Sequence, residues 1–156
     1  MEEFGKLEER VVLVGVQTGD NDNVEESLDE LEELASTAGA VTVGKIIQNR
    51  EAVHPGTYIG KGKIEEVRAL VYAMDATGII CDDELSPAQL NNLERELDCK
   101  VMDRTLLILD IFAARAITSE GKIQVELAQL RYRSARLVGL RESLSRLGGG
   151  IRSEER

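Results

Sequence analysis

The chain has 156 residues and a formal net charge of −10, which suits one ordinary domain with or without an appendage and argues against simple nucleic-acid binding. With no Trp, two Phe and three Tyr, the core has to be filled by aliphatic side chains. No apolar run approaches the roughly 20 residues of a membrane span, and the acidic start MEEFGKLEER is no signal peptide, so we expect a soluble, cytoplasmic protein.

Short β-branched runs alternate with amphipathic helical patterns over the first hundred residues. The runs predict buried strands at 10–17, 40–49, 77–84 and 99–102. The alternation predicts an α/β subdomain over residues 1–102, built as a small parallel sheet of about four strands flanked by helices. Loops that follow the strands then meet at one edge of the sheet, where function usually collects.

Three helices are expected between the strands. Asn23 with Glu26 three residues later is a capping-box pattern, and Gly39 is a typical stop for that helix. The clearest start is the segment SPAQ (86–89), in which Ser caps, Pro takes the first helical position and Gln closes the box. The expected apolar faces are Val24, Leu28, Leu31 and Ala35 in the first helix, Ile64, Val67, Val71 and Met74 in the second, and Leu90, Leu93 and Leu97 in the third.

The segment HPGTYIGKGK (54–63) is a glycine-rich loop at the functional edge. It lacks the G-x-x-x-x-G-K-[S/T] spacing of a P-loop and the third glycine of a dinucleotide fingerprint. One interpretation makes Gly60, Lys61, Gly62 and Lys63 a phosphate-binding group at a helix N-terminus, for RNA or a nucleotide. The other is that the glycines only permit the tight turn into the helix and the lysines are solvated, with Gly62 as the candidate for a positive φ.

Several other polar residues invite a structural and a functional interpretation. Asp82 and Asp83 follow the third strand, and we favour helix-capping surface over a magnesium site for them. We expect a structural ion pair at the DRT segment (103–105), where the sheet meets the next helix. His54, the single histidine, has no nucleophile or metal partner in the pattern and is expected to be a turn residue. The two cysteines, Cys81 and Cys99, lack metal-ligand spacing and are expected to be buried thiols.

After Arg104 the pattern becomes wholly helical. Residues 105–117 are nearly all apolar, so this helix is expected to be buried on several sides. TSEGK (118–122) interrupts it, and a longer helix with a near-heptad seam follows, which together predict a long antiparallel helical hairpin over 103–147. The near-heptad seam of the longer helix consists of Ile123, Leu127, Leu130, Leu137, Leu140, Leu144 and Leu147. Residues 148–156 begin with three glycines, which predicts a linker or tail.

Charge is distributed unevenly between the two parts. Residues 1–100 carry 9 basic and 22 acidic side chains, whereas residues 101–156 carry 10 basic and 7 acidic ones. All basic residues in the second group are arginines except Lys122. Such an asymmetry is a hint of a nucleic-acid partner for the hairpin, with a solvated helix surface as the alternative.

The motifs together resemble the N-terminal part of the HflX family of translational GTPases. The segments that carry the likeness are PGTYIGKGKIEE, DDELSPAQLNNLE, DRTLLILDIFAARAITSEGKIQVELAQLRYR and LSRLGGG, which match in register from about residue 54 to 150. The resemblance implies a cytoplasmic, ribosome-associated protein that binds the large ribosomal subunit and splits stalled or idle ribosomes. It also implies that the hairpin tip contacts ribosomal RNA and that a GTPase domain follows.

That resemblance assigns roles to the hairpin. The implied RNA-contacting residues are the tip, Thr118, Ser119, Glu120, Gly121 and Lys122, and behind it Arg131, Arg133, Arg136 and Arg141. Arginines there would contact phosphates and orient the protein without reading sequence.

The chain departs from the family pattern at its end. The family continues into G-x-R-G-P-G-E and a P-loop, but here GGGIRSEER ends the sequence, and no P-loop or N-K-x-D motif occurs. We therefore expect an N-terminal fragment without cofactor or enzymatic activity, whose GTP and magnesium would bind in the missing GTPase domain. The alternative is a weak ATPase with ATP on the glycine loop, since some family members are described as using ATP in this half.

Overall fold

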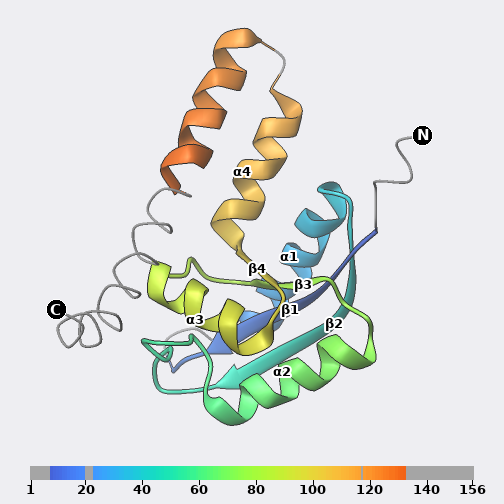
Figure 1. Ribbon diagram of the computed structural model, residues 1–156, viewed down its shortest axis with the longest axis vertical. Coiled ribbons are helices and arrows are strands. Elements are labelled where there is room, and N and C mark those ends of the chain that lie inside the picture. The colour runs from blue at the N-terminus through green and yellow to red at the C-terminus, as the bar shows by residue number, and fades with distance from the viewer. Residues whose placement is uncertain (1–7, 20–22, 117, 133–156) are drawn as a thin grey trace, which may run out of the picture.

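The computed structural model describes residues 8–19, 23–116 and 118–132, and it confirms the α/β class (Figure 1). Its sheet has four parallel strands in the order β2-β1-β3-β4. In the sheet register, Val11 of β1 lies opposite Gly78 of β3, which in turn lies opposite Lys100 of β4. The strands are β1 (Glu9–Gln17), β2 (Ala40–Asn49), β3 (Gly78–Cys81) and β4 (Lys100–Asp103).

Helices cover both faces of the sheet, which explains why the strands read as continuous apolar runs. Side chains that alternate along β1 enter two separate cores. One core, under α2 (Lys61–Ala73) and α3 (Pro87–Leu97), contains Val12 and Val14; the other, under α1 (Val24–Thr37) and the start of α4 (Arg104–Arg115), contains Leu13. The predicted inner faces of α1 and α3 are buried in these cores.

The helix ends were predicted with mixed success. The capping box of α3 is confirmed, with the Gln89 backbone N–H donating to Ser86 Oγ at 3.1 Å. Gly39 is confirmed as the stop of α1 and takes a φ of +94°. The box predicted for Asn23 is wrong, because its side chain makes no capping hydrogen bond. Asn23 has a ψ of 33° where Ser86 has an extended 160°, so its side chain is not aimed at the first-turn N–H groups.

The helical hairpin projects from one end of the α/β body (Figure 1). A second helix begins at residue 119 and runs back beside α4 to the last described residue, 132. Gln129 donates to Asp110 at 2.8 Å across the pair. The expectation that the apolar helix is buried on several sides is wrong: Leu106 and Leu107 are buried, but Phe112 is 57% exposed, because only the base of α4 reaches the sheet. Ile123, Leu127 and Leu130 are also exposed, and the rest of the predicted seam lies outside the described residues.

Candidate functional site

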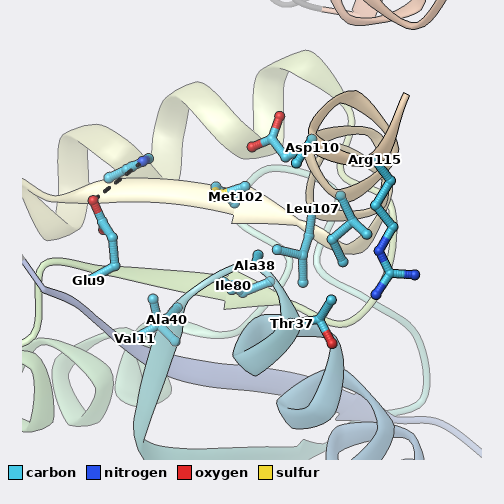
Figure 2. A pocket seen from close by; sticks show the side chains of 13 residues that line it. Glu9, Val11, Thr37, Ala38, Ala40, Ile80, Met102, Leu107, Asp110 and Arg115 are labelled. Atoms are coloured by element: carbon cyan, nitrogen blue, oxygen red, sulfur yellow. Dashed lines mark ion pairs between the residues drawn. The ribbon is translucent and has the colours of Figure 1, made fainter. Parts of the chain in front are cut away.

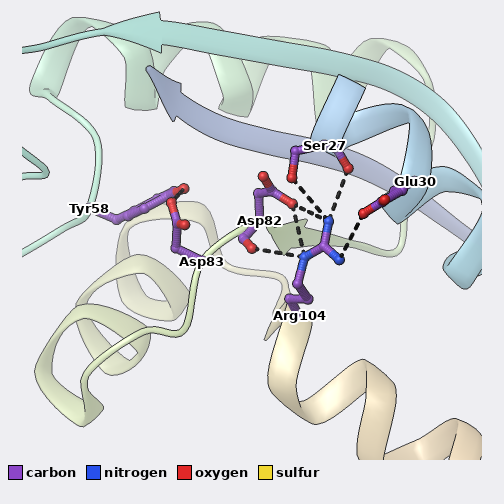
Figure 3. Close-up of polar contacts among 6 residues, drawn as sticks. All are labelled: Ser27, Glu30, Tyr58, Asp82, Asp83 and Arg104. Atoms are coloured by element: carbon purple, nitrogen blue, oxygen red, sulfur yellow. Dashed lines mark hydrogen bonds and ion pairs between the residues drawn. The ribbon is translucent and has the colours of Figure 1, made fainter. Parts of the chain in front are cut away.

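The carboxyl edge of the sheet holds a cluster of polar side chains around Arg104, the first residue of α4 (Figure 3). Its Nη2 donates to Asp82 Oδ1 at 2.8 Å and to the backbone oxygen and Oγ of Ser27 at 3.0 and 3.1 Å. Its Nη1 lies 3.6 Å from Glu30 Oε1. One guanidinium therefore joins the end of β3, the first turns of α1 and the base of the hairpin.

This cluster occupies the place where related sheets usually bind ligands. The strand order reverses between β1 and β3, and ligands in open α/β sheets bind outside the carboxyl ends of the strands at such a reversal. Here Asp82 follows β3, Ser27 lies in the helix after β1, and Arg104 fills the space between them. The arrangement favours a fixed structural joint over a nucleotide crevice.

Asp103, the acid of the DRT segment, forms hydrogen bonds and not the ion pair expected at this segment. It is fully buried, its Oδ1 accepts from the Leu106 N–H at 3.0 Å, and its Oδ2 accepts from the Leu85 N–H at 2.8 Å and from the Tyr132 hydroxyl. Its extended backbone turns the carboxylate toward the first turn of α4, where it caps the helix. The ion pair predicted at this joint exists, but its acid is Asp82 and not Asp103.

The two acids proposed as weak magnesium candidates point to different partners. Asp82 is buried and paired with Arg104, whereas Asp83 is exposed and accepts a 2.6 Å hydrogen bond from the Tyr58 hydroxyl (Figure 3). Among the described residues, no group of three or more His, Cys, Asp or Glu side chains has the arrangement of a metal site. The expected helix-capping role is wrong for both acids, because Ser86 caps α3 while Asp82 is buried against Arg104 and Asp83 binds Tyr58.

The glycine loop has its conformational strain at a residue that the sequence did not reveal. Tyr58, buried at 1% exposure, takes a φ of +68°, whereas Gly62 lies in the first turn of α2 without a positive φ. The expectation for Gly62 is therefore wrong. His54 holds the turn: its backbone exchanges two hydrogen bonds with Tyr58, and its Nδ1 accepts from the Gly56 N–H at 3.0 Å. The prediction that His54 is a turn residue is confirmed.

The polar groups of residues 60–63 are partly engaged within the protein. The Gly60 N–H donates to Gln48 Oε1 at 2.8 Å, and the Lys63 ammonium pairs with Glu66 at 2.9 Å. Lys61 is exposed at the first helical position, and the first-turn N–H groups of a helix attract anions. The geometry is compatible with a phosphate contact at this helix start, but it builds no enclosed cradle there.

The hairpin tip is small, polar and exposed. Thr118 Oγ1 accepts from the Gly121 N–H at 2.9 Å and so starts the second helix, while Ser119, Glu120 and Lys122 are exposed. Arg131 is exposed further along this helix. The remaining candidate RNA contacts, Arg133, Arg136 and Arg141, lie outside the described residues.

Comparison with known proteins identifies the family. Residues 25–113 match the family model described as GTP-binding GTPase N-terminal, and residues 115–156 match the one described as GTP-binding GTPase Middle Region. A protein from Lacrimispora saccharolytica named GTPase HflX is 73% identical over 96% of this chain. The chain belongs to the HflX family. The GTPase HflX of Escherichia coli is 49% identical to this HflX-family chain over 92% of its residues.

The relatives are much longer than this chain. It spans 35% of the Lacrimispora saccharolytica protein and 33% of the Escherichia coli protein. Among solved structures, a variant of SsGBP matches 85% of this HflX-family chain with a TM-score of 0.66 and 25% identity, over 41% of its own length. A GTP-binding protein from Sulfolobus solfataricus, solved in complex with GDP, matches 94% of the chain over 46% of its own length. Its TM-score of 0.57 at 22% identity shows the same fold.

Proposed function

We propose that this HflX-family chain is a ribosome-binding module that contacts large-subunit ribosomal RNA through its hairpin, without catalysis of its own. The observation that carries the proposal is the shape of the molecule: a hairpin with a small polar tip projects from an acidic body (Figure 1). The body would be repelled by RNA phosphates, since residues 1–100 carry 22 acidic and 9 basic side chains. The hairpin belongs to residues 101–156, which carry 10 basic and 7 acidic side chains, so an element that projects from the acidic body is better suited to reach RNA.

The joint at Arg104 supports the same proposal. A tip that has to reach a defined place on a large particle needs a fixed direction relative to its body. Arg104 binds Ser27 of α1 and Asp82 after β3. Asp103 accepts hydrogen bonds from the Leu85 N–H before α3, the Leu106 N–H in α4 and the hydroxyl of Tyr132 in the second hairpin helix. These bonds orient the base of both hairpin helices, because each partner belongs to a different element.

In the longer relatives, this module would act together with a GTPase domain. The relatives are named GTPases, and GTP with magnesium would bind in the part of those proteins that the present 156 residues do not match. We place the full protein on ribosomes in the cytoplasm, where it would split or rescue stalled particles. None of the helices in the described residues combines the length and the hydropathy that a membrane span requires.

A second candidate function is ATP binding at Gly60–Lys63 with weak hydrolysis. The start of α2 at Lys61, with a second lysine in its first turn, is the observation that favours it. The same geometry offers little for hydrolysis, because Asp82 is held by Arg104 and Asp83 by Tyr58. We therefore rank ribosome binding first.

A sedimentation experiment separates the two functions. The chain is mixed with purified large or small ribosomal subunits, with and without ATP, and the pellet is assayed. Ribosome binding predicts sedimentation with large subunits, little with small ones, and no effect of ATP. Failure to sediment with large subunits, or sedimentation only with ATP, would contradict the first proposal.

A further inference from the structure

A cavity of about 320 Å³ lies between the sheet, the end of α1 and the inner side of α4 (Figure 2). Its floor is formed by Val11, Ile80 and Met102, one from each of three adjacent strands, and its walls include Leu107 and Ile111 of α4. The cavity exists because α4 leaves the sheet at its base while α1 stays packed on it, so a wedge opens between the two helices.

The charged residues at the rim leave one cation without a partner among the described residues. Glu9 lies 3.9 Å from the Lys100 ammonium and accepts from the Thr77 hydroxyl at 2.9 Å. Asp110 accepts from Gln129 at 2.8 Å. Arg115, in the last turn of α4, is exposed and makes no ion pair or hydrogen bond within the described ranges. The rim thus offers a guanidinium above an apolar floor.

We propose that this cavity binds a small apolar molecule that carries a single carboxylate, such as a medium-chain fatty acid. Its volume lies at the lower end of ligand pockets, which run from about 300 to 1,000 Å³ and are mostly apolar with a few placed polar groups. The apolar part would cover Val11, Ile80 and Met102, and the carboxylate would meet the two parallel donors of Arg115. This site is separate from the hairpin tip and does not depend on ribosome binding.

Methionine methyl NMR provides the test, because the chain carries its own internal control. Met102 lines the cavity, whereas Met74 ends α2 on the opposite face of the sheet. Titration of the methyl-¹³C-methionine chain with octanoate is expected to shift the Met102 signal with saturation and to leave Met74 in place. An unmoved Met102 signal, or equal shifts of Met102 and Met74, would overturn the proposal.

Matched variants locate the two halves of the ligand. Ala114→Trp places an indole in the cavity at an exposed helical position and is expected to abolish the octanoate shift, whereas Phe112→Trp, at an exposed position of α4 that does not line the cavity, is expected to preserve it. Arg115→Gln is expected to weaken octanoate about 2- to 5-fold, in line with an exposed charge pair, and to leave uncharged 1-octanol unchanged. Equal affinity of wild type and Arg115→Gln for octanoate would remove the carboxylate from the proposal.

Discussion

At the scale of single residues, Arg104 is the side chain that connects most elements. Its partner Asp82 has a side chain only 5% exposed, while Arg104 is 24% exposed. Removing one member of a buried pair leaves the other charge without compensation, which costs roughly 3–5 kcal/mol when both are buried. A substitution of Arg104 is therefore expected to destabilise the contact between the hairpin base and the α/β body.

Arg104→Met is expected to lower the free energy of unfolding by about 2–4 kcal/mol, somewhat below the fully buried case because Arg104 is partly solvated. Arg68→Met is the control, since the Arg68 ion pairs with Glu65 and Glu96 are exposed and worth at most about 1 kcal/mol. Urea unfolding measures both variants. Equal losses would show that the Arg104 cluster is no more than a surface ion pair.

Cys99 offers a pH-dependent prediction. Burial, followed by the nearby charges of Glu94 and Asp98, raises the pKa of the Cys99 thiol to about 11. The folded state thus holds this proton more tightly than the unfolded chain, whose thiols titrate near about 8.5. The contribution of the neutral Cys99 thiol to the free energy of unfolding is fully present below the pKa of the unfolded thiol. It is lost as the pH rises toward 11.

Alkylation of Cys99 by iodoacetamide is expected to rise with a midpoint near pH 11 in the folded chain and near about 8.5 in urea, because the thiolate is the reactive form. Cys81 is the control, since it is fully buried and should react only after unfolding. Mass spectrometry of the labelled peptides resolves the two sites. A folded-state midpoint near 8.5 for Cys99 would contradict the burial argument.

At the scale of elements, the start of α2 separates two glycines with different roles. A Cβ at Gly62 would meet nothing within 4 Å, whereas a Cβ at Gly60 would lie 2.7 Å from Arg50 Nη1. Gly62→Ala is therefore expected to stabilise the protein by about 0.5–1 kcal/mol through helix propensity. Gly60→Ala is expected to lower stability, because Gly60 is the N-cap of α2, where Ala is poorer than Gly, and Gln48, which accepts from the Gly60 N–H, would be crowded by the new methyl group.

Thermal unfolding of the two glycine variants checks this pair. The expected order of melting temperature is Gly62→Ala above wild type and Gly60→Ala below it. A lower melting temperature for Gly62→Ala would mean that this position is constrained in a way that its open surroundings do not explain.

The element scale also shows what sequence can and cannot predict. Periodicity and caps predicted the four strands, the inner faces of α1 and α3 and the SPAQ start, because those signals act within a few residues. Ion-pair partners that are distant in sequence could not be predicted. Several acidic residues could have paired with Arg104, and Asp82 lies beside it because β3 and β4 are paired in the sheet. The exposed side of α4 was missed because an apolar pattern does not reveal that the helix leaves its sheet.

Within the glycine loop, the same limit explains the error at Gly62. A positive φ was expected at a glycine of HPGTYIGKGK, because glycine adopts this conformation most easily. In the structure, Tyr58 has the positive φ. A buried ring and a hydroxyl bound to Asp83 compensate for the strain at Tyr58, and the hydroxyl's partner lies 25 positions away in the sequence. The candidate RNA contacts remain predictions, since they rest on the family resemblance and on exposure.

At the scale of the whole molecule, charge and shape support the proposal that the hairpin is the RNA-binding element. The body is acidic, whereas residues 101–156 carry more basic than acidic side chains, 10 against 7. Phosphate contacts by such side chains release counterions, so binding weakens with salt in proportion to their number. Among the candidate RNA contacts of the hairpin, two described residues are basic, Lys122 and Arg131, and the glycine loop also has two, Lys61 and Lys63, which makes a balanced comparison.

The most direct test measures large-subunit binding of two charge-reversal pairs, Lys122→Glu with Arg131→Glu and Lys61→Glu with Lys63→Glu, over a range of salt concentrations. The hairpin pair is expected to bind weakly and to lower the log–log salt slope by up to about 1.8, at roughly 0.9 for each phosphate that the variant no longer neutralises. The loop pair is expected to bind and respond to salt nearly as wild type does. If the loop pair abolishes binding while the hairpin pair behaves as wild type, the recognition element is the glycine loop and the central claim is wrong.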